Sequence, residues 1–207
     1  MFNFLKLAKT RGALALESHI EKPEESNLFS QFPRVSSNHF AIELICDSAR
    51  IMTMGMDKSH EFEDLLNKEL DKHHHETMRN AGALQSMSDA LPALGIVAAV
   101  LGVIKTMASI SEPPEILGAM IGSALVGTFL GVLLSYGLVG PFASRLKQVY
   151  EDEHRFYEII RDTLVAHMAG NAPQISVEIG RKSVPSELQP TFYELEEAIA
   201  ATPPVAS

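Results

Sequence analysis

The fold is decided by the stretch LPALGIVAAVLGVIKTMASI-SEPPE-ILGAMIGSALVGTFLGVLLSYGLV, which spans residues 91–139. Its first part, residues 91–110, is an apolar run with a single charged residue, and its last part, residues 116–139, is an apolar run with none. A helix needs roughly 20 apolar residues to cross a bilayer, and both runs meet this length. Residues 111–115 between them contain two prolines, which interrupt a helix. The sequence therefore predicts a hairpin that crosses a membrane twice.

The rest of the chain is charged and contrasts with this hairpin. A net charge of −9 and a mixed composition would suit an acidic soluble protein, but the apolar residues are concentrated in one segment. On both sides of it, apolar residues recur at helical spacing. We expect flanking helices over residues 1–22, 37–54, from 57 into the first span, 144–169 and 192–200. The expected fold is an all-α integral membrane protein, in which a two-helix transmembrane hairpin joins a cytoplasmic helical domain built from both flanks.

Basic residues predict the orientation of the hairpin, because lysine and arginine stay on the cytoplasmic side of a membrane. They gather on the outer flanks, at Lys68, Lys72, Arg79, Arg145, Lys147 and Arg155, whereas the short turn carries only two glutamates. Lys105 lies near the outer end of its span and can reach the headgroups. Six segments follow, namely a cytoplasmic helical part (1–90), a transmembrane helix (91–110), a periplasmic turn (111–115), a second transmembrane helix (116–139), a cytoplasmic helical segment (140–200) and a disordered tail (201–207).

Small residues in the two spans predict close helix packing, since glycines spaced four apart let membrane helices approach each other. The packing candidates are Gly95, Gly102, Gly118, Gly122, Gly127 and Gly131. Part of this pattern serves the contact between the two spans themselves. Because small residues occupy more than one face of the second span, we also expect further helices to pack there, from an oligomer or from a partner.

Three residues of the hairpin have both a structural and a functional interpretation. The hydroxyl of Thr128 in the middle of a span either bonds the carbonyl four residues back or lines a narrow polar path. Pro92 opens the first span and Pro141 closes the second, each as a helix-terminal proline or as a hinge. Neither span contains Asp, Glu or His. If the chain conducts protons, the titrating group must come from another subunit, because proton relays need such residues in the membrane.

Catalytic and metal-binding patterns are absent from the sequence. The consecutive histidines His73, His74 and His75 point about 100° apart on a helix and cannot converge on one ion, so we interpret them as a solvated face. No phosphate-binding loop, nucleophile elbow or zinc-protease motif occurs. The single Cys46 excludes an internal disulfide and fits a reducing compartment. We expect no enzyme activity, no cofactor, no metal and no nucleic acid partner.

Three separated stretches carry a resemblance to a known family. PALGIVAAVLGVIKTM (92–107) and ALVGTFLGVLLSYGLVGP (124–141) closely resemble the last two membrane helices of the MotA family of flagellar motor stator proteins. RGALALESHIEKPEESNLF (11–29) is similar to the start of the cytoplasmic loop domain of that family, and VEIGRKSVPSELQPTFYELEEAI (177–199) is similar to its C-terminal segment. One departure stands at the front: MotA proteins have four membrane helices, and this sequence resembles one that lacks the first two.

The resemblance implies a proton-driven machine. Five MotA-type chains would surround a pair of MotB helices, and MotB would supply the proton-binding Asp. Ion passage would turn this ring and push the rotor through the switch protein FliG. The implied location is the inner membrane, with contacts to lipid, and the tail resembles proton-type more than sodium-type (PomA) members.

The resemblance also implies roles for particular residues. Pro92 and Pro141 match the prolines at the cytoplasmic ends of the two spans, Thr128 matches a hydroxyl beside the ion path, and Ala99 lies one turn deeper in the membrane than Gly95. Glu17 matches an acidic residue that contacts the rotor. Its basic counterpart falls on Lys9, where lysine keeps the charge but loses the bidentate fork of arginine, and neighbouring Arg11 is a second candidate.

Two alternative functions are compatible with the hairpin. ExbB/TolQ-like proteins also surround a partner helix and use proton flow, but the stretches at 11–29 and 177–199 favour the MotA family. A membrane-anchored interaction fragment without conduction is the other alternative. A soluble enzyme would have to bury both apolar runs in a core, and no catalytic motif supports it.

Overall fold

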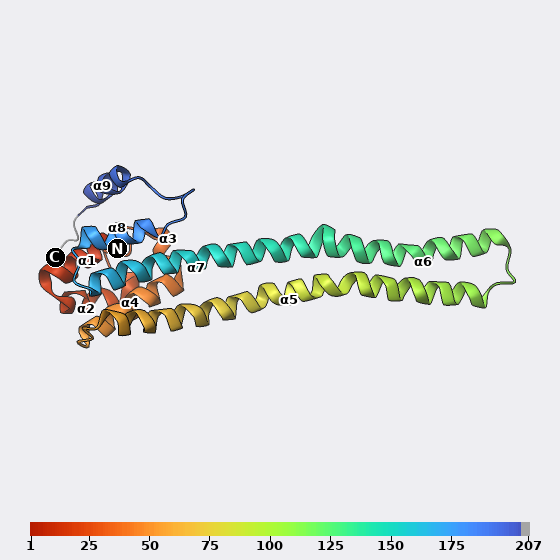
Figure 1. The fold of residues 1–207 in the computed structure, drawn as a ribbon, viewed down its shortest axis with the longest axis horizontal. Helices are drawn as coiled ribbons and strands as arrows, with labels where there is room; N and C mark the ends of the chain where they lie inside the picture. Colours follow the sequence, from red (N-terminus) through yellow and green to blue (C-terminus); the bar gives the residue numbers. More distant parts are fainter. Residues whose placement is uncertain (204–207) are drawn as a thin grey trace. The chain divides into compact units, whose positions relative to one another are not determined.

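The computed structural model describes residues 1–203, which form helices and connecting turns without a strand (Figure 1). The helices in chain order are α1 (Phe2–Arg11), the 3-10 helix η1 (Ala13–Leu16), α2 (Glu17–Glu21), the 3-10 helix η2 (Pro23–Glu25), α3 (Pro33–Ser36), α4 (His39–Thr53), α5 (Ser59–Ala108), α6 (Pro114–Leu134), the π-helix η3 (Ser135–Val139), α7 (Gly140–Met168), α8 (Pro173–Lys182) and α9 (Phe192–Ala201). They divide into two compact units. We call Met1–Lys72 with the residues from Glu153 onward the helical unit, and His73–Asp152 the hairpin unit.

The helical unit encloses a hydrophobic core to which both ends of the chain contribute. Its fully buried side chains come from α1, η1, α2, α4, the first turns of α5 and the last turns of α7. The largest are Phe4, Leu5, Leu16, Ile20, Leu44, Phe62, Leu66, Leu70 and Leu164. Polar bonds join the same elements. Asn38 donates to the hydroxyl of Tyr157 at 3.1 Å, and Arg161 donates to Asn67 at 2.9 Å. The expected helical domain built from both flanks is thus confirmed.

The hairpin unit consists of two antiparallel helices joined by a short turn between Ala108 and Pro114. α5 runs without a break through Pro92, as expected for a helix that enters the first span from residue 57 onward. The other side is helical from Pro114 to Met168, because η3 connects α6 directly to α7. The helix-terminal interpretation of Pro92 and Pro141 is therefore wrong, since both prolines lie inside helical segments.

Other boundaries also differ from the expectation. The single helix expected over residues 1–22 is wrong, because Gly12 adopts a φ of 85° that ends α1, and a 3-10 turn precedes α2. The helix expected from residue 37 begins at His39. Asn38 accepts a hydrogen bond from the backbone N–H of Ala41 at 3.0 Å and so caps α4. Of the tail expected to be disordered over 201–207, Ala201 is the last residue of α9, and residues 204–207 lie outside the described part.

Candidate functional site

The two helices of the hairpin unit touch through glycine. A Cβ built at Gly95 would come 2.8 Å from the carbonyl oxygen of Gly127 and 3.1 Å from the Cα of Gly131. A Cβ at Gly131 would come 2.7 Å from the carbonyl oxygen of Leu91. Real side-chain carbons do not approach this closely, so the backbones meet at a distance that only glycine permits.

The same contact continues toward the turn. The Cβ position of Gly102 overlaps the Cβ of Ala124. That of Gly127 lies 2.9 Å from the Cβ of Ala98 and 3.5 Å from the backbone nitrogen of Ala99. Four of the six glycines predicted to pack therefore join α5 to α6. The other two, Gly118 and Gly122, have no atom of the described residues within 4 Å of their Cβ positions outside their own helix.

Thr128 lies at this contact, where its Cα is 3.2 Å from the Cβ position of Gly95. Thr106 donates to the carbonyl oxygen of Gly102 at 2.9 Å, as a threonine in an apolar helix usually does. The hydroxyl of Thr128 makes no such bond, nor any other hydrogen bond to residues 1–203. The interpretation in which this hydroxyl bonds the carbonyl four residues back is therefore not met among the described residues.

Pro92 leaves the carbonyl of Ser88 without its helical donor, because proline has no N–H. A side chain of the other helix replaces it: the hydroxyl of Ser135 donates to the carbonyl oxygen of Ser88 at 2.7 Å. In turn, the hydroxyl of Ser88 lies 3.1 Å from the carbonyl oxygen of Ser135. Both serines are buried. The sequence analysis missed Ser88, which lies just before the first span.

Pro141 is accommodated by the π-helix that precedes it. The backbone N–H of Gly140 bonds the carbonyl of Ser135, five residues back, in place of the usual four. The extra residue rotates the buried face of the helix: Phe142, seven residues after Ser135, is 71% exposed, whereas Ala143 is 2% exposed. Pro141 itself is exposed. The helix therefore continues through Pro141, and its buried face is shifted after the π-helix.

The three charged candidates lie on the surface of the helical unit. Lys9 and Arg11 are at the end of α1, and Glu17 begins α2 after the turn at Gly12. Lys9 donates to the carbonyl oxygen of Gly170 at 3.4 Å. The side chains of Arg11 and Glu17 form no ion pair or hydrogen bond with other residues of 1–203, and no ion pair joins Lys9 to Glu17. All three side chains are exposed and available to a partner.

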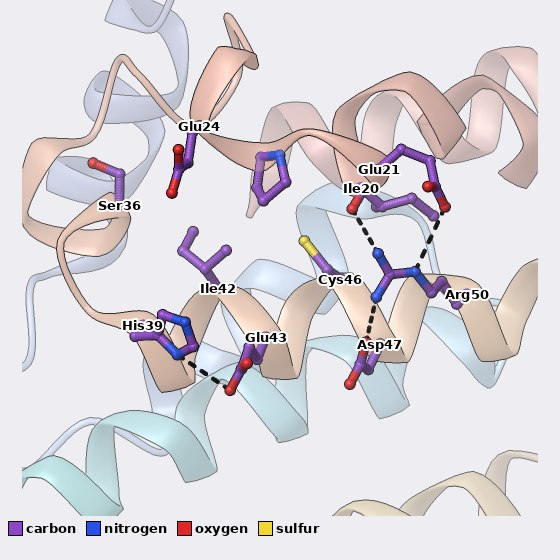
Figure 2. A pocket seen from close by; sticks show the side chains of 11 residues that line it. Ile20, Glu21, Glu24, Ser36, His39, Ile42, Glu43, Cys46, Asp47 and Arg50 are labelled. Atoms are coloured by element: carbon purple, nitrogen blue, oxygen red, sulfur yellow. Dashed lines mark hydrogen bonds and ion pairs between the residues drawn. The ribbon is translucent and has the colours of Figure 1, made fainter.

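Figure 2 shows a pocket of the helical unit that the sequence analysis did not predict. It holds about 470 Å³ between α2, η2 and α4, and Arg50 lies at one end of it. Arg50 contacts Asp47 at 2.5 Å, Glu21 at 3.8 Å and the carbonyl oxygen of Ile20 at 2.9 Å. These bonds tie α2 to α4 and so fix the helix that begins with Glu17. Burial raises the pKa of the neighbouring Cys46 thiol to about 11, which makes it unreactive.

Two helices of the described chain, Ser59–Ala108 and Pro114–Met168, are long and apolar enough to cross a membrane. Only 11% of the most apolar window of each is buried by the rest of the chain. A core helix of a soluble protein would be mostly covered. The exposed apolar surface and the glycine-lined contact between the helices define a membrane protein of the helical hairpin class.

A comparison with protein families agrees with this class. The chain belongs to the MotA/TolQ/ExbB proton channel family, whose model matches residues 42–159. Motility protein A of Salmonella typhimurium is 38% identical over 201 residues, which cover 97% of this chain and 68% of that protein. The chemotaxis protein LafT of Vibrio parahaemolyticus is 37% identical over 96% of this chain and 70% of that protein.

Solved structures show the same fold. The structure of C. jejuni MotAB matches 92% of this chain and 68% of the compared chain, with a TM-score of 0.74 and 19% identity. The flagellar MotAB stator complex from Bacillus subtilis matches 95% of this chain and 68% of the compared chain, with a TM-score of 0.69 and 24% identity.

Proposed function

We propose that this chain is a subunit of a flagellar motor stator, which conducts protons together with a MotB-type partner and converts the ion flow into torque on the rotor. Family membership and the similarity to motility protein A over almost the whole chain support this function. The family is one of proton channels, and we propose no catalytic activity for the chain.

The observation that carries the mechanism is chemical. This chain belongs to a proton channel family, yet its two spans, residues 91–110 and 116–139, contain no Asp, Glu or His. A proton relay needs a titratable group, so the partner must bring a carboxyl group to these helices. The unpaired hydroxyl of Thr128 is a side-chain group in the middle of the second span that can bind water or a proton carrier there.

The open small-residue face supports an oligomer. Gly118 and Gly122 are not used by the hairpin itself, and close contact between membrane helices is what such residues permit. We propose that copies of the chain, five in the ring, surround the partner helices and expose their outer apolar side chains to lipid. We place the ring in the inner membrane, with both chain ends in the cytoplasm, as the positions of the basic residues indicate.

The remaining candidates divide between two tasks. Pro92, Ala99, Thr128 and Pro141 lie along the hairpin and would act in ion passage and its gating. Lys9, Arg11 and Glu17 lie on the helical unit and would contact the rotor protein FliG. Charged surface residues suit this second task, because complementary charges steer and orient a partner.

Complementation tests the proposal. The chain is expressed with MotB in a non-motile strain that lacks its own MotA. Because the chain spans 68% of the length of the Salmonella relative, a second version carries two membrane helices upstream. We expect the extended version to restore swimming. If both versions reach the membrane and neither restores swimming, the stator function is wrong, and ExbB/TolQ-type partners become the next to test.

Substitutions in the hairpin test the ion path in the extended version. Thr128→Val removes the hydroxyl at nearly constant shape, and we expect proton influx to fall by a few-fold or more, since a hydrogen bond contributes about 0.5–1.5 kcal/mol. Thr128→Ser keeps the hydroxyl and serves as the matched control. Pro92→Leu restores a backbone donor in α5 and is expected to stop swimming. Normal swimming of Pro92→Leu at normal protein levels would contradict a role for this proline.

A further inference from the structure

Ser88 and Ser135 form a reciprocal pair across the hairpin unit. The hydroxyl of Ser135 donates to the carbonyl oxygen of Ser88 at 2.7 Å, and the hydroxyl of Ser88 donates to the carbonyl oxygen of Ser135 at 3.1 Å. The two hydroxyl oxygens are 3.2 Å apart. Each hydroxyl has one proton, so donation to the carbonyls satisfies both serines at once.

The pair stands where both helices depart from regular geometry. Pro92 leaves the carbonyl of Ser88 without its backbone donor, and the π-helix begins at Ser135. The serines are 2% and 1% exposed. A buried carbonyl without a partner is costly, and the hydroxyl of Ser135 supplies the missing bond.

The surroundings leave no room for a larger group. A Cβ at Gly140 would come 3.0 Å from the carbonyl oxygen of Ser135 and 3.2 Å from the hydroxyl of Ser88. The absence of a side chain at residue 140 thus keeps the two serines in contact. Both partners and the residue that makes room for them belong to the hairpin unit.

The pair is also in line with the contact between Gly95 and Thr128. Ala81, Ser88 and Gly95 are buried at intervals of seven residues on α5, so they share one face of the helix. On the other helix, Ser135 follows Gly131 by one turn, and Gly131 packs against Gly95. The next contact of Gly95 is Thr128. A hydrogen-bonded pair beside the contacts of Gly95 with Gly131 and Thr128 would resist sliding of one helix along the other.

We propose that Ser88 and Ser135 are positioning residues, whose reciprocal hydrogen bonds replace the backbone bond lost at Pro92 and hold Gly95 in register against Thr128. The inference rests on the proposed function for its effect on ion flow. The arrangement of the two serines is independent of that function.

Cysteine cross-linking tests the arrangement. In the extended chain with Cys46→Ala, we expect Ser88→Cys with Ser135→Cys to form an intrachain disulfide under mild oxidation, because the two side chains meet. The matched control is Ser86→Cys with Ser135→Cys: Ser86 lies on the same helix, is exposed and bonds its own backbone at Gly82. Equal cross-linking of the two pairs would overturn the proposal.

Proton influx tests the positioning role. We expect Ser135→Ala to lower influx about ten-fold, because it leaves the buried carbonyl of Ser88 without a partner. Ser88→Ala should lower influx less, because the carbonyl of Ser135 still accepts the backbone N–H of Gly140. The double variant should conduct protons no more slowly than Ser135→Ala alone, because the two hydroxyls act as one unit. In the Ser88→Cys and Ser135→Cys variant, oxidation should restore the influx that the reduced form lacks, since the disulfide holds the same register.

The opposite results are equally informative. Normal influx in both alanine variants, or a disulfide that blocks a conducting reduced form, would overturn the positioning role. If the extended chain with native serines conducts no protons while only the 88–135 pair cross-links, the proposed function fails and the serine contact stands. A double-mutant cycle on the thermal unfolding of the purified protein then decides whether the pair holds the helices together.

Discussion

His167 lies in the last turn of α7, half-buried in the helical unit and close to Lys9. Burial lowers the pKa of His167, and the positive charge of Lys9 lowers it further. The unfolded chain therefore binds a proton on His167 at a pH where the folded chain does not. The contribution of neutral His167 to the free energy of unfolding should be fully present above about pH 6.5. It should be lost as the pH falls from there through the lowered pKa of the folded state.

The measurement is thermal unfolding of the detergent-solubilised protein between about pH 5 and 7.5. His167→Gln removes the titration, and we expect it to flatten this part of the profile. His60→Gln is the control, because His60 lies in the same unit near the start of α5. Equal profiles for the native protein and His167→Gln would contradict the role of His167.

At the residue scale, the sequence predicted a polar role for Thr128 but not the serine pair. A lone hydroxyl in an apolar run is visible in any sequence. Ser88 lies outside the apolar run and among other polar residues, so only its seven-residue spacing from Gly95 could have marked it. Its partner could not be found at all from spacing, because the register between two antiparallel helices depends on their packing.

At the element scale, the hairpin glycines form two groups that differ in what surrounds them. Gly95→Ala would place a methyl group 2.8 Å from the carbonyl oxygen of Gly127, whereas Gly118→Ala would meet no atom of residues 1–203 within 4 Å outside its own helix. Overpacking of this kind costs about 1–3 kcal/mol. We expect Gly95→Ala to lower the midpoint of thermal unfolding in detergent, and Gly118→Ala to leave it nearly unchanged.

The same two variants separate folding from assembly. Gly118→Ala fills a face that the hairpin leaves open, so its effect should be on the oligomer. Size-exclusion chromatography or cross-linking of membranes measures that effect. An unfolding midpoint that falls equally in both variants would contradict the division of the glycines.

The turn between α1 and α2 depends on a backbone conformation. Gly12 has a φ of 85° and a ψ of 162°, which residues with a side chain rarely adopt, although its Cβ position has no atom of the described part of the chain within 4 Å apart from its two chain neighbours. Gly12→Ala should therefore destabilise the helical unit by about 1–3 kcal/mol through backbone strain alone. Gly82→Ala, in the regular helix α5 with equally open space, should be neutral or stabilising by up to about 1 kcal/mol.

Urea unfolding followed by circular dichroism compares the two variants. Because Gly12 separates Lys9 from Glu17, loss of this turn would also change how the two charges are presented. A stable Gly12→Ala protein with a longer first helix would mean that the turn is dispensable.

The sequence predicted the hairpin because the length and hydropathy of each apolar run, and the prolines between the runs, are local features of the sequence. It left a helix-terminal interpretation of Pro92 and Pro141 open, and that interpretation is wrong because a proline ends a helix only where the freed carbonyl finds no other partner. Ser135 provides that partner for Ser88, and the π-helix absorbs the second proline. Both solutions come from the opposite helix or from a change in helix type, which a proline in the sequence does not reveal.

At the scale of the whole molecule, segregation of apolar and charged residues was enough to predict a hairpin and a helical unit built from both flanks. The hydrophobic core of that unit could not be predicted from the sequence. It joins residues such as Phe4 and Leu164, which are far apart in the chain, and no local pattern shows that they meet.

The separation into two units predicts that ion flow and rotor contact respond to different substitutions. Glu17 is the sharper test of rotor contact, since its side chain is exposed and forms no ion pair or hydrogen bond within residues 1–203. Lys9 also bonds the carbonyl of Gly170 and lowers the pKa of His167, so its reversal would change the fold as well. We expect Glu17→Lys to abolish or strongly reduce swimming while protein level and proton influx stay unchanged.

Lys6→Glu is the matched control, because it reverses an exposed charge on α1, in the same helical unit as Glu17. A surface charge with no role in contact should leave motility intact, since isolated surface charges contribute little to stability. Reduced torque in Glu17→Lys at unchanged influx would locate the defect at the rotor. Unchanged motility would contradict the contact. A loss of influx together with motility would show that the helical unit and the hairpin act as one coupled element, with the charge at residue 17 sensed in the membrane.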